Sequence, residues 1–126
     1  MLRLAEKTAI TSTFPRARVG AVIANKNIVI SIGVNKVRYF KDCPTSKKFE
    51  NSLHAEQAAI MKILRTGQGN KLRNTTIFVC RVNKHGKCRL AKPCSHCLDL
   101  IKFVGIKRIV YSTDTLPVRE LVRSQS

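Results

Sequence analysis

The order of its strand-like segments is the feature of this chain that most constrains its fold. Two runs rich in β-branched residues, 19–24 and 28–32, follow one another across a short polar gap, a pattern typical of a β-hairpin. Two further strand-like runs, 75–82 and 108–112, each come after a segment of helical character. Because a sheet built this way needs helices over its apolar faces, the order predicts a three-layer α/β/α sandwich.

Three segments are predicted to be helices, and each is followed by a residue that ends helices: 2–13 before Pro15, 53–65 before Gly67, and 94–104 before Gly105. Segment 35–52 is predicted to be a loop. A short fifth strand can form around 116–121, where Pro117 would confine it to an edge of the sheet.

The length of 126 residues fits one domain, spanning 1–126. No apolar run reaches the roughly 18 residues that a membrane helix needs. The N-terminal segment lacks the pattern of a signal peptide, so we expect an intracellular, cytoplasmic protein. Five cysteines are an odd number, which favours reduced thiols or metal ligands over a disulfide framework.

The charge balance points to a polyanionic partner. Lysine and arginine number 24 against seven acidic residues, for a net charge of +17. The alternative is that the basic balance only keeps the protein soluble. Two basic segments stand out: 35–49, where five cations alternate with aromatic residues, and 81–92. Cationic grooves with aromatic platforms are typical of single-strand binders, although the aromatic residues could equally pack inward.

Two short motifs carry the candidate chemistry. His54-Ala-Glu56 lies at the start of one predicted helix, and Cys94-Ser-His-Cys97 opens another directly after Pro93. Cysteines three residues apart share one face of a helix, and the first turn of a helix favours thiolates. Two thiolates and one imidazole form a catalytic zinc set with a fourth position left for water, and zinc lowers the pKa of that water.

Glu56 is placed differently from the three candidate ligands. It lies two residues after His54, which turns it about 200° around the helix axis. That direction disfavours sharing the metal but lets the carboxylate reach a water beside it. We therefore expect Glu56 to move protons, taking one from the water and passing protons to the ring nitrogen and the leaving amine.

The combination of His-x-Glu with Pro-Cys-x-x-Cys resembles the zinc-dependent nucleobase deaminases, and the chain from Arg18 to Ser112 is similar to the cytidine deaminase superfamily. The resemblance implies a mixed five-stranded sheet with helices on both faces, a bound Zn²⁺, and contact between Asn35 and the substrate sugar. The candidate substrate-binding residues are Gly20, Ala21, Asn35, Ser95 and His96.

Other metal sites remain open alternatives. Cys88, Cys94 and Cys97 together with His85 or His96 could form a closed structural site. That reading leaves the His-Ala-Glu motif without a role. A second metal could bind at Cys43 or Cys88. Cys80, within an apolar run, is predicted to be a small core residue.

The motif favours cytosine over adenine. Adenosine deaminases that act on tRNA usually have Met before and Gly-Ala after the second cysteine, whereas Cys97 lies between His96 and Leu98-Asp99. Three hypotheses remain: hydrolytic deamination of cytosine in single-stranded nucleic acid, with DNA slightly favoured over RNA; deamination of free dCMP or (deoxy)cytidine; and a zinc protein that binds nucleic acid without catalysis.

The charge favours the first hypothesis, because one nucleotide needs only one or two cations whereas a strand rewards many. A homo-oligomer is compatible with these hypotheses. The candidate nucleic-acid contacts are the basic and aromatic residues of the two basic segments: Lys36, Arg38, Tyr39, Phe40, Lys47, Lys48, Lys84, Arg89 and Lys92.

Overall fold

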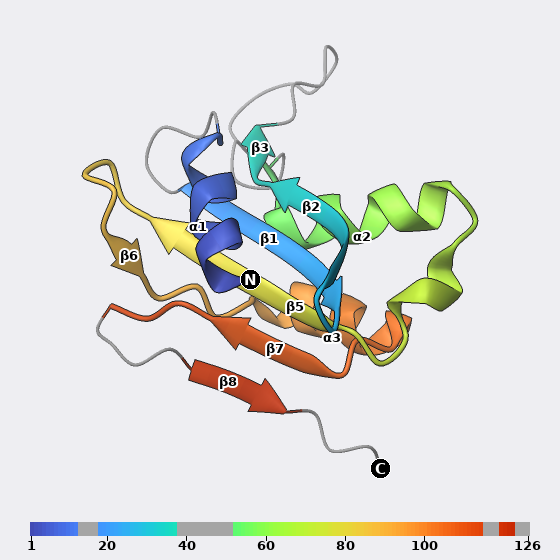
Figure 1. Cartoon of the computed structure of the whole chain (residues 1–126). Helices are drawn as coiled ribbons and strands as arrows, with labels where there is room; N and C mark the ends of the chain where they lie inside the picture. Colours follow the sequence, from blue (N-terminus) through green and yellow to red (C-terminus); the bar gives the residue numbers. More distant parts are fainter. Residues whose placement is uncertain (13–17, 38–51, 115–118, 123–126) are drawn as a thin grey trace.

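A mixed β-sheet forms the centre of the molecule (Figure 1). The computed structural model describes residues 1–12, 18–37, 52–114 and 119–122. The strands run in the order β2 (Ile28–Val34), β1 (Arg18–Asn25), β5 (Thr76–Val82), β7 (Arg108–Tyr111) and β8 (Arg119–Val122). Neighbours pair antiparallel, except that β5 and β7 are parallel. The predicted five-stranded mixed sheet is confirmed, with β8 at one edge.

Helices cover both faces of this sheet, as predicted. Helix α1 (Leu2–Ile10) packs on β1 and β5 on one face, while α2 (Ala55–Arg65) and α3 (Ser95–Val104) lie on the other (Figure 1). None of the helices in the described part of the chain combines the length and apolar character that crossing a bilayer requires.

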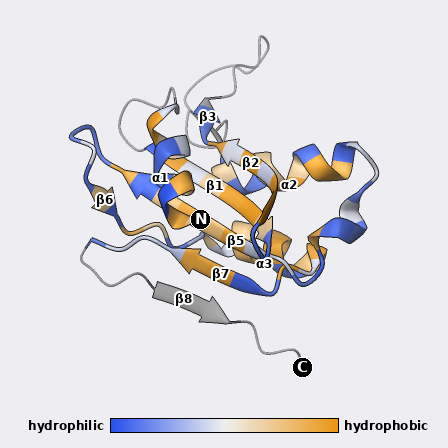
Figure 2. Ribbon diagram, in the orientation of Figure 1, coloured by the Kyte–Doolittle hydropathy of each residue, from blue (hydrophilic) through white to orange (hydrophobic). Residues whose placement is uncertain are grey.

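Alternation along β1 divides the core between the two faces. Ala21 and Ile23 pack under α2 and α3, whereas Val22 packs with Ala5 and Ala9 of α1. Side chains of a strand point to opposite faces in turn, so one strand serves both layers. Fully burying an isoleucine such as Ile23 contributes roughly 1.5–3 kcal/mol. Figure 2 shows the apolar stretches of β1 and β5 at the centre and a hydrophilic tip on the hairpin beyond β5.

Two glycines let helices approach the sheet closely. A Cβ on Gly20 would collide with the backbone of α1 at Ala5 and Ala9. A Cβ on Gly33 would meet the backbone of α2 at the carbonyl oxygen of Ala55. Both helices therefore lie against strands whose contact positions lack side chains.

Short elements inside two predicted loops were not anticipated from the sequence. At the two ends of segment 35–52, β3 (Lys36–Val37) pairs with β4 (Ser52–Leu53), so Leu53 is a strand residue and not the start of the helix as predicted. After β5, the chain turns back as β6 (Cys88–Arg89), which pairs with the end of β5. A 3-10 turn, η1 (Gly69–Leu72), follows α2. The β3–β4 pair brings the end of β2 next to the start of α2, where the site lies.

Candidate active site

His54 occupies the N-cap of α2 and is fixed there by its backbone. Its N–H donates a hydrogen bond of 3.1 Å to Oε1 of Gln57 in the first turn. This contact is half of a capping box and satisfies a backbone donor at the helix end. The β3–β4 pair fixes the preceding residue, Leu53. The backbone that carries the imidazole is thus fixed by the β3–β4 pair before His54 and by the first turn of α2 after it.

The two motif cysteines lie at the start of α3. Cys94 is the N-cap, its carbonyl accepts a 2.8 Å hydrogen bond from the N–H of Leu98, and Cys97 lies in the first turn. Side chains at the N-cap and three residues later meet at the same helix end. The thiol of Cys97 is buried and that of Cys94 is exposed, so the pair reaches from the core to the surface.

The three side chains meet at one point. Their ligand atoms all lie within 4.8 Å of one another. Nδ1 of His54 is 3.2 Å from Sγ of Cys97 and 3.6 Å from Sγ of Cys94. Nitrogen and sulfur bound to one tetrahedral zinc ion would be about 3.5 Å apart, by the usual bond lengths. The spacing and the donor types therefore fit zinc.

Burial works against ionisation of the Cys97 thiol. The pKa of Cys97 is raised well above its ordinary value, chiefly by burial and further by the nearby carboxyl of Glu56. The position of Cys97 at the helix start predicted a thiolate, but its burial could not be seen from that position. A metal ion that binds here has to displace the thiol proton, so binding releases protons.

Glu56 lies beside these ligand atoms and is buried, with 5% of its surface exposed. The described residues whose ligand atoms come together are His54, Cys94 and Cys97, and Glu56 is not one of them. Burial raises the pKa of Glu56 above its ordinary value of 4.5, against the opposing effects of a backbone hydrogen bond and the nearby His54. A raised pKa suits a carboxyl group that must both accept and donate a proton near neutral pH.

A hollow of about 260 Å³ opens over this group. His54, Glu56 and Cys94 lie on its wall. Apolar side chains from β1, β5 and the segment before α3 complete the wall, and two cations also line it: Val19, Val79, Leu90, Arg81 and Lys92. The volume is just below the roughly 300–1,000 Å³ typical of small-molecule sites. Its size and mixed lining suit a flat base with a sugar.

Asn35 lines the same hollow and has a fixed orientation. Its Oδ1 accepts a 2.8 Å hydrogen bond from the N–H of Val19 and lies 2.6 Å from the hydroxyl of Ser12, which donates to it. With the oxygen held by these donors, the amide nitrogen occupies the other position of the side chain. Asn35 is therefore a buried polar group with a fixed orientation in the wall of the hollow.

Comparison with known proteins identifies the family. Residues 1–113 match the family model described as the cytidine and deoxycytidylate deaminase zinc-binding region. The chain belongs to this family. Membership supports zinc as the cofactor and a zinc-dependent hydrolase that deaminates a cytosine-type base, and the His-Cys-Cys group gives the metal a fitting donor set.

Solved structures share the deaminase fold. A cytidine deaminase from Burkholderia pseudomallei has a TM-score of 0.69 at 16% identity, covering 96% of this chain and 88% of that one. A dCMP deaminase from the cyanophage S-TIM5 has a TM-score of 0.59 at 20% identity, covering 87% and 80%. A cytidine deaminase from Mycobacterium tuberculosis has a TM-score of 0.58 at 20% identity, covering 88% and 80%. No curated protein matches the sequence significantly.

Several of the predicted substrate-binding residues do not line the hollow over the metal-binding group. Gly20 faces α1 on the opposite side of the sheet, and Ala21 is fully buried in the core. The strand alternates, so Val19 lines the hollow instead. Gly20 and Ala21 are not among the described residues that line the hollow. Ser95 and His96 are exposed on the first turn of α3, and the hollow is lined there by Cys94.

The predicted nucleic-acid contacts divide into two sets. Lys36, Lys84, Arg89 and Lys92 are exposed, and Lys92 lines the hollow. The others lie outside the described residues: Arg38, Tyr39, Phe40, Lys47 and Lys48.

The closed structural site is not supported by the described residues. Their metal-binding group contains neither Cys88 nor His85 nor His96. Sγ of Cys88 instead lies 3.9 Å from Sγ of Cys80. Cys80 is buried, as predicted for a core residue, and burial raises its pKa to about 12. Cys43 lies outside the described residues.

Sequence reasoning missed most of the apolar wall. Leu90 and Ala91 come just before the cysteine motif, but nothing in their pattern shows that they face the site. Their placement depends on hydrogen bonds across the molecule, such as the 2.8 Å bond from the N–H of Ala91 to the carbonyl of Ser112. The only available signal was their closeness in sequence to Cys94.

Proposed function

We propose that this chain hydrolyses the exocyclic amine of cytosine, giving uracil and ammonia, with zinc held by His54, Cys94 and Cys97. The observation that carries the proposal is the meeting of these ligand atoms within 4.8 Å, beside a buried Glu56, on the wall of a hollow of about 260 Å³. A zinc protein that binds nucleic acid without catalysis would give the buried carboxyl no role.

The side chains divide the chemical work. When bound, zinc supplies a water of lowered pKa as the nucleophile. Glu56 accepts a proton from the attacking water and delivers protons to the ring nitrogen and to the departing amine. Its raised pKa favours the return of those protons. Val19, Val79 and Leu90 pack against the base and exclude bulk water from the reacting carbon.

Asn35 suits a role in orienting the sugar. Because Val19 and Ser12 hold its Oδ1, its amide group has only one orientation in which both hydrogen bonds are kept. A substrate hydroxyl or carbonyl in the hollow would then meet a donor of fixed position. Such preorganisation places the base over the metal without further rearrangement.

The proposed substrate is cytosine in single-stranded nucleic acid, with DNA slightly favoured over RNA. What supports this is the net charge of +17 and the exposed cations Lys36, Lys84, Arg89 and Lys92 on the segments that lead to the site. A strand presents a row of phosphates, and neutralising each one releases counterions. One nucleotide would leave most of these cations without a ligand.

A free nucleotide is the second candidate, and it has its own support. The description of the matching family model names cytidine and deoxycytidylate deaminases. The hollow is small, and one phosphate needs only one or two cations, such as Arg81, which lines its wall. A homo-oligomer is compatible with both candidates.

A direct comparison of substrates tests the proposal. Zinc-loaded protein is incubated with dCMP, deoxycytidine, cytidine, a cytosine-containing DNA oligonucleotide, the matching RNA and the duplex, and product bases are measured by mass spectrometry. Deamination mainly in the single strands supports the first candidate, and deamination only of dCMP, deoxycytidine or cytidine supports the second. No uracil from any of these would refute cytosine deamination.

A further inference from the structure

A second hollow adjoins the one over the metal-binding group. Its volume is about 380 Å³, and the described residues on its wall are Arg81, Asn83, Arg89, Leu90 and Asp114. Arg81 and Leu90 line both hollows. The two are therefore neighbours, separated by the side chains that they share. A ligand with its base in the first hollow can extend into the second.

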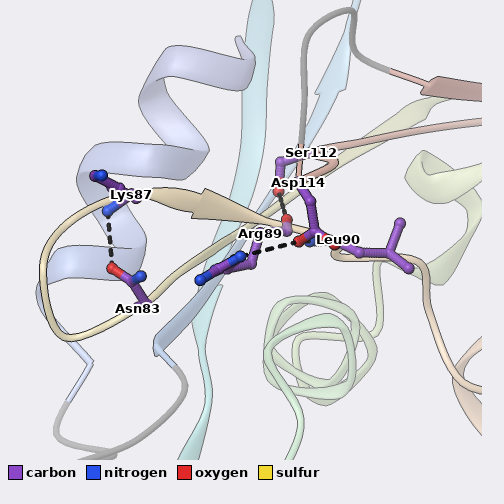
Figure 3. Close-up of polar contacts among 6 residues, drawn as sticks. All are labelled: Asn83, Lys87, Arg89, Leu90, Ser112 and Asp114. Carbon is purple, nitrogen blue, oxygen red and sulfur yellow. Dashed lines mark hydrogen bonds and ion pairs between the residues drawn. The ribbon is translucent and has the colours of Figure 1, made fainter.

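The wall of this second hollow is built on a fixed backbone. The hydroxyl of Ser112, a buried residue, donates a 2.6 Å hydrogen bond to the carbonyl of Arg89 and accepts one of 3.1 Å from the N–H of Arg81 (Figure 3 shows the first). Oδ1 of Asp114 accepts a 3.0 Å hydrogen bond from the N–H of Leu90. The two arginines therefore start from main-chain positions held together by Ser112.

The wall of this hollow carries more positive than negative charge. The guanidinium of Arg89 lies 3.9 Å from Oδ1 of Asp114, a long contact between half-exposed groups (Figure 3). That oxygen is already engaged by Leu90. The described residues that line the hollow provide no second carboxylate for the guanidinium of Arg81. Two arginines and one partly engaged carboxylate therefore line the hollow, which leaves guanidinium donors for an anion with several oxygens.

We propose that this second hollow is a phosphate-binding subsite, in which Arg81 and Arg89 hold a phosphate attached to the sugar of the cytosine substrate. The inference rests on the proposed function for the position of the base. The phosphate is either the monoester of a free nucleotide or the diester beside the reacting nucleoside in a strand. Asp114 positions the loop through Leu90 and lowers the affinity for the anion through its charge.

The test for a free nucleotide compares dCMP with deoxycytidine. The preference is the ratio of their kcat/KM values. Arg89→Ala should lower this ratio by about tenfold, the size expected when one charge-assisted contact is lost. Arg65→Ala is the matched control, because it removes the same group at the far end of α2, about 15 Å from the site end of the helix. The control should keep the wild-type ratio.

Asp114→Asn gives a change of opposite sign. The amide oxygen can still accept the hydrogen bond from Leu90, but the charge that repels phosphate is gone. The preference for dCMP should rise by about threefold, as expected for an exposed charge. A residue with a purely structural role would give no gain, so an unchanged or lower preference would contradict the part assigned to Asp114.

The test for a strand uses an oligonucleotide with one uncharged methylphosphonate linkage, placed directly 5′ or directly 3′ of the target deoxycytidine. At one of these positions the neutral linkage should lower kcat/KM by about tenfold in the wild type and Arg65→Ala. Arg89→Ala should have lost this sensitivity. The inference is overturned if Arg89→Ala changes neither the dCMP preference nor the response to the neutral linkage.

Binding of inorganic phosphate separates the inference from the proposed function. Titration of ¹⁵N-labelled protein should shift the amide signals of Arg81, Arg89 and Ser112, and Arg89→Ala should weaken that response. If phosphate binds there while no cytosine compound is deaminated, the subsite stands and the proposed function falls. If cytosine compounds are deaminated but these amides do not respond to phosphate, the subsite falls and the proposed function stands.

Discussion

Cys97 gives zinc binding a predicted pH dependence. Burial raises the pKa of its thiol, so the apo protein holds a proton there throughout the neutral range. Zinc must displace that proton, and its apparent affinity should rise by about tenfold per pH unit for each proton released. Competition with a chelator at pH 6.5 and 7.5 measures this dependence. An affinity that is the same at both values would show that the thiol is already ionised.

The metal assignment makes a second prediction at the scale of single residues. Cys94→Ala should lose zinc, because it removes one of three ligand atoms that lie together. His96→Ala should keep about one zinc per chain, because His96 is exposed and outside that group. Metal analysis of both purified variants checks this. Zinc retained in the first variant would show that Cys94 is not a ligand, and zinc lost from the second would show that His96 is one.

Single residues of the site were predictable where a local rule fixed them. Two motifs at helix starts identified His54, Cys94 and Cys97, since a side chain at the first turn points to the helix end whatever the fold. Which residues of β1 line the hollow was not predictable, because the face of β1 that meets the site depends on where α1 packs. That packing joins distant parts of the chain and leaves no local pattern.

At the scale of elements, the contact between α1 and the sheet depends on Gly20. Gly20→Ala should lower the free energy of unfolding by roughly 1–3 kcal/mol, because the new methyl group meets the backbone of α1. Gly69→Ala is the control, because its Cβ would meet only the end of the Leu64 side chain. Urea unfolding of both variants measures the difference. If the two variants had equal free energies of unfolding, α1 would be able to shift away from Gly20 with little loss of stability.

The longer elements and the short edge strand β8 were predictable, and the two-residue strands were not. Strands such as β5 show an apolar run long enough to recognise, and the glycine that ends α3 has the left-handed backbone expected there, with φ of 89°. The two-residue strands β3, β4 and β6 are too short for any periodicity. They form because neighbouring elements bring them together, and the β3–β4 pair lies between Asn35 and His54 of the site.

At the scale of the whole molecule, the net charge of +17 predicts a salt response that separates the two candidate substrates. Each phosphate contact with a single strand contributes about −0.7 to the slope of log affinity against log salt, so four contacts give about −2.8. A fourfold rise in salt should then weaken oligonucleotide binding by about fiftyfold. The KM for dCMP should change only a few-fold.

Lys47 and Lys48 provide the matching variant, although both lie outside the described residues. Their joint replacement by Ala should reduce the salt slope for the strand and leave turnover of dCMP nearly intact. Activity against salt is measured on both substrates side by side. Strong turnover of dCMP with little salt dependence, and none of the oligonucleotide, would establish the free nucleotide as the substrate.

The central claim is that Glu56 moves protons beside a zinc ion held by His54, Cys94 and Cys97. The most direct measurement is the deamination rate of Glu56→Gln on dCMP and on the oligonucleotide, together with its zinc content and thermal stability. The amide fills the same space but cannot accept the proton, so the variant should stay folded with about one zinc per chain and lose activity by about 10²-fold or more. A rate near that of the wild type, with zinc bound, would contradict the account.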